Sequence, residues 1–362
     1  MEQKLAFDVA HIISSKTPFE LLDQLALTCE PFDKIISVGK PLRETFPAKL
    51  EILQPAFGVQ SLAISKIENL INLGSILHVW SDEMVELAVA VAKKKKCEIL
   101  LSVMSVNSNC EENKLPWIAG ANNIKIITRT QAGVKSCLDI GADPTKFASV
   151  PLAADVVADD HISSTRIRVR RELGIDDKTT VLAVPADVLT PESGQKIAIW
   201  AHAILSWVVD DIYLIVPGNS DEFDTIYKFA TNTGFVDRIH FTKDEFTPAE
   251  VISACDIAVF AGDENHKNLG RIAESIMQSC PTIVDDCAEI TEITNAGQLA
   301  KLVSVEPKTV SSAMLELIEN SDITDKLITS CKSNHSKFSP ENAKSALAEI
   351  YKSLVKDSEN DE

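Results

Sequence analysis

The residues best suited to chemistry gather in the second half of the chain, between His266 and Glu274. Lys267 and Arg271 are four positions apart, so on a helix their positive charges would share one face. The imidazole of His266 could hydrogen-bond a sugar or a phosphate, and Glu274 supplies a carboxylate. Cations, an imidazole and a carboxylate in so short a stretch suit a ligand that carries both phosphates and hydroxyl groups.

The elements around these residues would place them at the edge of a sheet. The apolar pattern predicts a buried strand over 257–260, an amphipathic helix over about 268–279 and a second strand over 282–284. In that order the amino end of the helix, which includes Gly270, lies at the carboxyl end of a parallel sheet. Backbone N–H groups and the helix dipole favour an anion there. The stretch therefore predicts a nucleotide or sugar-phosphate site.

Several of these residues fall at the spacing of a known donor-site motif. Glu274, Pro281, the strand over 282–284 and Glu292 match positions in retaining, GT4-like glycosyltransferases of the GT-B fold, which the chain resembles. The resemblance implies an α/β protein with two Rossmann-like domains facing across a cleft. It also implies that Glu274 accepts hydrogen bonds from both hydroxyl groups of the donor's ribose.

Other positions of this motif carry different residue types. His266 stands at the family's first glutamate, and we assign it to the catalytic position although an imidazole cannot act there as a carboxylate. Ser279 stands at the turn glycine, and Ala288 with Glu289 stands at a glycine pair. The resemblance therefore implies the fold more directly than it implies the activity.

The family usually neutralises the leaving diphosphate without a metal, using an arginine and a lysine after the first strand of the second domain. The turn PESG (191–194) aligns Val188 and Ser193 with these two positions, and neither side chain is charged. Nearby cations such as Lys196 and Arg271 could substitute. Alternatively the loop is misaligned and Lys196 is itself the phosphate lysine, or the chain keeps the fold and has lost transfer activity.

A second segment, 123–156, supports the same resemblance. Its pattern predicts a strand over 124–128, a helix that Thr130 caps, and a further strand within KFASVPL (146–152). Members of the family have these elements in this order just before the hinge between their two domains. An ordinary helix-strand unit is the alternative interpretation of this segment. It is weakened because two segments of the chain match the family in the right order.

Apolar strands alternate with helical patterns on both sides of a boundary that we place near residue 160. The predicted parts are an acceptor-side domain over 1–160, a nucleotide-sugar domain over 161–338, a helix over 339–357 that crosses back to the first domain, and a frayed acidic tail over 358–362.

The elements predicted in the second domain are strands over 181–185, 212–218, 238–241 and 257–260 and helices over about 193–208, 221–233 and 247–254. Gly218 ends the second of these strands, where the family has a glycine close to the nucleotide. Trp200 and Trp207 are seven positions apart on the first helix, and we expect both to pack in the core. His78 ends a predicted strand of the first domain, where a structural role is favoured over substrate binding.

The composition excludes several classes of partner. A formal net charge of −18 over 362 residues argues against nucleic acid and anionic membranes. The eight cysteines form no CxxC pair, so we expect buried free thiols in a reducing cytoplasm and no metal site. No segment approaches the roughly 20 apolar residues of a membrane span, and the first residues do not form a signal peptide.

These observations favour a metal-independent glycosyltransferase of the cytoplasm that moves a sugar from a nucleotide diphosphate sugar to an unknown acceptor with retention. A catalytically inactive binding or scaffold protein of the same fold is the alternative, and a nucleotide-sugar epimerase shares the architecture. The sequence contains no GxSxG, HExxH, Walker or GxGxxG motif, which argues against hydrolases, zincins, P-loop proteins and typical dinucleotide-binding enzymes.

Overall fold

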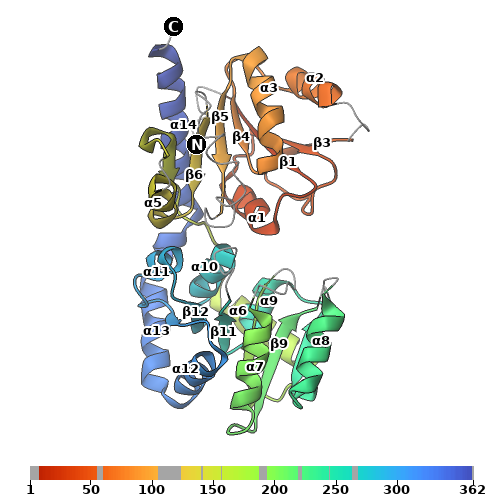
Figure 1. The fold of residues 1–362 in the computed structure, drawn as a ribbon, viewed down its shortest axis with the longest axis vertical. Coiled ribbons are helices and arrows are strands. Elements are labelled where there is room, and N and C mark those ends of the chain that lie inside the picture. The colour runs from red at the N-terminus through yellow and green to blue at the C-terminus, as the bar shows by residue number, and fades with distance from the viewer. Residues whose placement is uncertain are drawn as a thin grey trace. The chain divides into compact units, whose positions relative to one another are not determined.

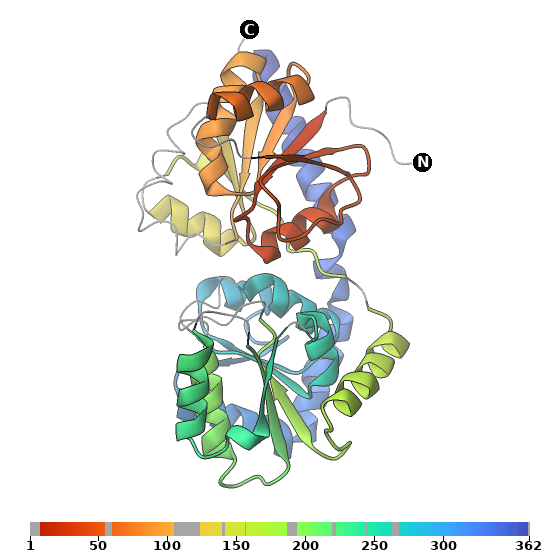
Figure 2. The same cartoon turned by 90° about the vertical axis from the view of Figure 1, so that its right-hand side faces the viewer.

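The chain forms two compact units, each built on one parallel sheet with helices on both of its faces (Figures 1 and 2). Unit 1 contains residues 1–153 and 340–362, and unit 2 contains residues 154–339. This computed structural model describes residues 8–54, 60–104, 124–139, 142–155, 157–186, 194–218, 222–243, 245–262 and 268–360. The boundary predicted near residue 160 falls inside the first helix of unit 2, Asp159–Glu172.

Unit 1 contains a seven-stranded parallel sheet. Its strands are β1 (Val9–Ser14), β2 (Lys34–Val38), β3 (Lys49–Leu53), β4 (Ile76–Val79), β5 (Glu98–Ser102), β6 (Ile124–Thr128) and β7 (Phe147–Ser149). Its helices are α1 (Phe19–Thr28), α2 (Gln60–Leu70), α3 (Val85–Lys95), α5 (Gln131–Asp139) and α14 (Pro340–Asn360), with short 3-10 helices η1 (Asp82–Met84) and η2 (Pro144–Lys146). The strand order is β3-β2-β1-β4-β5-β6-β7.

Alternate residues of the central strands of unit 1 enter two different cores. Ile76 and Leu100 pack with Leu347 of α14, whereas their neighbours Leu77 and Ile99 pack with the side chains of α2 and α3. A sheet that is covered on both faces needs apolar residues at nearly every position, which is why these strands appear in the sequence as continuous apolar runs. Helix α14 therefore covers part of one face of the first sheet, and α1 covers another part of that face, where it packs with Ile13 and Ile35.

Unit 2 contains a six-stranded parallel sheet. Its strands are β8 (Thr180–Ala183), β9 (Ile212–Pro217), β10 (Ile239–Thr242), β11 (Ile257–Phe260), β12 (Thr282–Asp285) and β13 (Lys301–Val303). Its helices are α6 (Asp159–Glu172), α7 (Gln195–Leu205), α8 (Phe223–Asn232), α9 (Pro248–Ala254), α10 (Leu269–Met277), α11 (Ala288–Ile293), α12 (Pro307–Glu319) and α13 (Ser321–Ser333), with η3 (Val236–Arg238) and η5 (His335–Phe338). The strand order is β10-β9-β8-β11-β12-β13.

The strands and helices predicted for the second domain are confirmed to within a few residues at each end. Helices α7, α8 and α12 share one core cluster with the sheet, and α9 packs against both α6 and α10. The basic residues of α6 have a structural role: Arg166 and Arg170 bind the two carboxylate oxygens of Asp256 at 2.5 and 2.6 Å. These ion pairs fix α6 to the amino end of β11, because Asp256 directly precedes that strand.

Candidate functional site

The strand order of unit 2 reverses between β8 and β11, and this point defines the candidate site. Strands on one side of it run β8, β9, β10 in chain order, and those on the other side run β11, β12, β13. Ligands of open parallel sheets bind at the carboxyl ends of the strands at such a reversal. Two helices begin there, α7 after β8 and α10 after β11.

Gly194 brings the start of α7 against the end of β11. It is the residue that precedes α7, with φ of 80°, and a Cβ atom on it would lie 2.4 Å from the carbonyl oxygen of Ala261. Both the backbone conformation and this contact require glycine. The sequence analysis did not identify Gly194 as a site residue, although it is the last residue of the PESG turn and the one that determines where α7 begins.

The starts of α7 and α10 both lack a side-chain cap. Gly194 has no side chain, and the side chain of Asn268 makes no capping hydrogen bond to α10. The first N–H groups of a helix have no partner within the helix, and the positive end of the helix dipole lies there. Lys196 and Gly270 lie in the first turns of α7 and α10, and both are half-buried. The arrangement suits a diphosphate.

Arg271 and Glu274, both predicted site residues, form an ion pair on α10. The guanidinium Nη1 lies 3.0 Å from the carboxylate Oε2, and the two side chains are 12% and 17% exposed. Residues three apart on a helix can meet in this way. The contact means that the charge of Arg271 is already partly neutralised and that the Glu274 carboxylate is held by a donor from its own helix.

Three further predicted residues of the donor site lie outside the described residues. They are Ser193, His266 and Lys267, and Val188 lies outside them as well. The assignment of His266 to the catalytic position therefore stays a prediction.

Gly218, the remaining predicted site residue, has a structural reason to be glycine. Its N–H donates a hydrogen bond to the carbonyl oxygen of Thr242, and a Cβ atom would lie 2.8 Å from that oxygen. The close approach of the chain after β9 to the end of β10 leaves no room for a side chain. A contact between Gly218 and a nucleotide stays a prediction.

Ser279 adopts the backbone conformation that glycine favours. Its φ is 55°, and the N–H of Cys280 bonds the carbonyl oxygen of Ser275 across the end of α10. This is the usual geometry of a helix that ends on a glycine. The conformation agrees with the alignment of Ser279 on the turn glycine of the donor motif, and the hydroxyl group lies 3.2 Å from Nε2 of His335.

Solved structures resemble this chain over almost its full length. HepE from Anabaena, in complex with UDP and glucose, has a TM-score of 0.77 at 15% sequence identity, over 96% of this chain and 100% of that chain. Sucrose-phosphate synthase from Thermosynechococcus elongatus has a TM-score of 0.75 at 11% identity, over 96% and 99%. WaaG, a glycosyltransferase involved in lipopolysaccharide biosynthesis, has a TM-score of 0.73 at 12% identity, over 95% and 99%.

The chain has the GT-B fold. The prediction of an α/β chain with two Rossmann-like domains is thereby confirmed, since both parallel sheets belong to the shared architecture. No protein-family model and no curated protein sequence matches the chain.

His78, at the end of β4 of this GT-B protein, is a structural residue. Its side chain is fully buried, with Nδ1 2.6 Å from the hydroxyl of Tyr351 and Nε2 2.7 Å from the hydroxyl of Ser102. Burial, with smaller effects of the charges of His11 and Arg129, lowers the pKa of His78 well below its ordinary value. A neutral imidazole with both nitrogens engaged cannot bind a substrate without losing these partners.

The cysteines of the described residues are free thiols, as predicted: Cys29, Cys97, Cys137, Cys255, Cys280 and Cys331 are buried and Cys287 is half-buried. Burial raises the pKa of Cys29 to about 11 and that of Cys331 to about 12. Within the described residues no cluster of histidine, cysteine and carboxylate side chains could hold a metal ion. Within the same ranges no helix is long and apolar enough to cross a bilayer.

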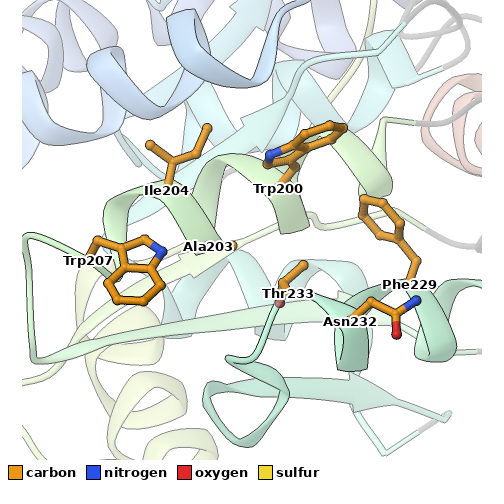
Figure 3. A pocket seen from close by; sticks show the side chains of 7 residues that line it. All are labelled: Trp200, Ala203, Ile204, Trp207, Phe229, Asn232 and Thr233. Atoms are coloured by element: carbon orange, nitrogen blue, oxygen red, sulfur yellow. The ribbon is translucent and has the colours of Figure 1, made fainter.

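The prediction that Trp200 and Trp207 pack in the core is wrong. The two side chains are 54% and 79% exposed and line an open groove of about 310 Å³ between α7 and α8. Figure 3 shows the groove together with Ile204, Phe229, Asn232 and Thr233. None of its lining residues is charged, and they lie away from the first turns of α7 and α10. The groove therefore does not offer the cations that a diphosphate needs.

Proposed function

We propose that this GT-B protein binds a nucleoside diphosphate sugar on unit 2 and transfers the sugar to an acceptor with retention of the anomeric configuration. The observation that carries the proposal is the contact of Gly194 with Ala261, which brings one uncapped helix start to the strand that leads into another. In the transfer reaction the glycosidic bond breaks and the diphosphate leaves with its charge. Helix starts with Lys196 and Arg271 in their first turns would stabilise that charge.

Solved relatives in the fold support the choice of ligand. Crystal structures of HepE from Anabaena contain UDP, UDP with glucose, and UDP-glucose. In this chain Glu274 lies one turn further into α10 than Arg271, and we assign it to the ribose, whose two hydroxyl groups can both donate to one carboxylate. In that role the ribose hydroxyls would add to, or replace, the bond that Arg271 donates.

Calorimetric titration with UDP, GDP and ADP tests the binding half of the proposal. We expect measurable binding with one base preferred, because the same helix starts serve every diphosphate while the base pocket discriminates. Incubation with the matching nucleotide sugar, followed by product analysis, then separates transfer from epimerisation. If none of the three nucleotides binds, the proposed function is wrong.

Substitution of Glu274 by glutamine tests the assignment of the ribose. The amide loses one acceptor oxygen and the negative charge, so the affinity for the preferred nucleotide should fall by about 1–3 kcal/mol. Glu319→Gln is the matched control, since Glu319 is an exposed residue of α12 and its substitution changes the net charge by the same amount. Equal affinity in the wild type and in Glu274→Gln would remove Glu274 from the site.

A binding protein without transfer activity is the second candidate, and the ion pair between Arg271 and Glu274 favours it. An arginine that is paired with a carboxylate stabilises a leaving diphosphate less than an unpaired arginine would, because the carboxylate offsets part of its charge. The two candidates differ in turnover. The protein is incubated with a UDP, a GDP and an ADP sugar in the presence of a panel of saccharides. If it binds a nucleotide but releases none from these sugars, the second candidate is supported.

A further inference from the structure

Arg129 of unit 1 is a buried arginine with most of its hydrogen-bonding capacity unused. The residue follows β6 directly and is 3% exposed. Within the part of the chain that the structure describes, its Nε and Nη1 atoms have no hydrogen-bond partner, and its Nη2 donates a long hydrogen bond, 3.4 Å, to the hydroxyl of Ser102. The guanidinium also lies over the ring of Trp80, 5.3 Å from the ring centroid.

No described carboxylate forms an ion pair with Arg129. Burial lowers the pKa of Arg129 to about 10, so the guanidinium still carries its charge at neutral pH. A buried charge without a partner is strongly unfavourable, and buried polar groups in folded proteins are almost always hydrogen-bonded. An arginine that is kept in this state indicates a partner of opposite charge that is not part of the described chain.

The position of Arg129 in the fold is one where ligands bind. Trp80 follows β4, Ser102 ends β5 and Arg129 follows β6, and these three strands are neighbours in the sheet (Figure 1). All three residues therefore lie at the carboxyl edge of a parallel sheet, the edge that faces ligands in open α/β folds. His78 of the same group is neutral and has both ring nitrogens engaged, so it does not compete for an anion.

We propose that Arg129 binds an oxyanion, a carboxylate or a phosphate, carried by a molecule that binds at the carboxyl edge of the sheet of unit 1. We identify this molecule as the acceptor of the transfer, and only this identification rests on the proposed function. A planar guanidinium can donate two parallel hydrogen bonds to either oxyanion. Because the side chain is buried, it must turn to reach the ligand. Among the contacts with described residues, this rotation loses the long hydrogen bond to Ser102 and the contact with Trp80.

The proposal is tested by titrating the full-length protein with inorganic phosphate and, separately, with acetate, at an ionic strength held constant with chloride. Phosphorus NMR line broadening reports the binding of phosphate, and the chemical shifts of ¹³C-labelled acetate report the binding of a carboxylate. With UDP present at saturating concentration to fill the site proposed on unit 2, we expect the wild type to bind at least one of these anions and Arg129→Gln to bind it at least tenfold more weakly. Arg171→Gln removes the same charge from an exposed position and should bind as the wild type does.

A fold control accompanies these titrations. Arg129→Met replaces an unpaired buried charge with an apolar chain of similar length, so its melting temperature without added anion should equal or exceed that of the wild type. It should also lose the stabilisation that the bound anion gives to the wild type. Binding of neither anion by the wild type, or equal binding by the wild type and Arg129→Gln, would overturn the proposal.

Titration of the same variants with UDP separates this proposal from the proposed function. We expect Arg129→Gln to bind UDP with the affinity of the wild type, because the donor is assigned to unit 2. If the wild type binds no UDP but its phosphate or acetate binding depends on Arg129, the proposed function fails and the anion site stands. If Arg129→Gln loses UDP affinity, the anion belongs to the donor, and the assignment to the acceptor is refuted.

Discussion

Replacement of His202 with leucine should make the stability of this protein less sensitive to acid. His202 lies in α7 and is fully buried. Burial, and to a smaller extent the charge of Arg238, lowers its pKa from 6.5 to about 4. Above pH 6.5 the imidazole is neutral in the folded and unfolded chains alike. Between pH 6.5 and about 4 the unfolded chain binds one proton more, so the free energy of unfolding falls as the pH falls.

The size of this effect follows from the two pKa values. The free energy of unfolding should change by about 1.4 kcal/mol per pH unit in this window, which amounts to about 2 kcal/mol at about pH 5 and about 3 kcal/mol at about pH 4. The leucine variant should lack this contribution while it keeps those of other groups. The difference in slope between the two proteins therefore isolates His202.

Urea denaturation at a series of pH values between about 4.5 and about 7.5 measures the slope. His161→Leu is the matched control, because the side chain of His161 is exposed. The dependence of the free energy of unfolding on pH should be the same in this variant as in the wild type. Parallel profiles for the wild type and His202→Leu would show that His202 is protonated as readily in the folded chain as in the unfolded chain. That result would refute the assignment of this acid sensitivity to burial within α7.

Three further substitutions test the architecture of unit 2 by urea denaturation. Gly194→Ala should lower the free energy of unfolding by about 2 kcal/mol or more, because its Cβ atom would clash with Ala261; an unchanged midpoint would contradict this. Arg170→Met leaves the carboxylate of Asp256, which is 33% exposed, with Arg166 and should cost about 1–3 kcal/mol; a loss below about 0.5 kcal/mol would not fit. Trp207→Gln should cost no more than about 1.5 kcal/mol, because the exposed ring contacts Phe235 edge-to-face, and a larger loss would mean that the ring is covered.

The strands of unit 2 could be predicted because each is a short apolar run between turn residues. Strand β3 was not predicted, since its residues KLEIL alternate between charged and apolar and its side chains are only partly buried, as an edge strand allows. Helix α6 was not predicted either. Few of its residues are buried, and its arginines fix it through Asp256, a partner far away in the sequence. The apolar pattern of a short segment indicates which of its residues are buried. It does not reveal ion pairs with residues far away in the sequence.

The same limit explains which parts of the site could be found from the sequence. The spacing of Trp200 and Trp207 correctly places them on one face of a helix, but spacing does not say whether anything covers that face. The helix that carries Arg271 could be predicted from its periodicity, whereas the requirement for glycine at position 194 depends on the carbonyl group of Ala261, which only the folded sheet brings near. Arg129 stood in the sequence as an ordinary residue between a strand and a helix cap, and only its burial reveals it.

Because α14 follows the other described elements in the sequence, the ribosome synthesises those elements before unit 1 can be completed. Until α14 is made, Ile76, Leu100 and Ile127 lack their packing contacts with Leu347 and Leu354. The imidazole of His78 likewise lacks its hydrogen bond to the hydroxyl of Tyr351. Unit 2, by contrast, is one continuous segment and can fold while the rest is still being translated. Unit 1 is thus synthesised first but completed last, and a nascent chain cut short before residue 340 would expose part of one face of the first sheet to solvent and to chaperones.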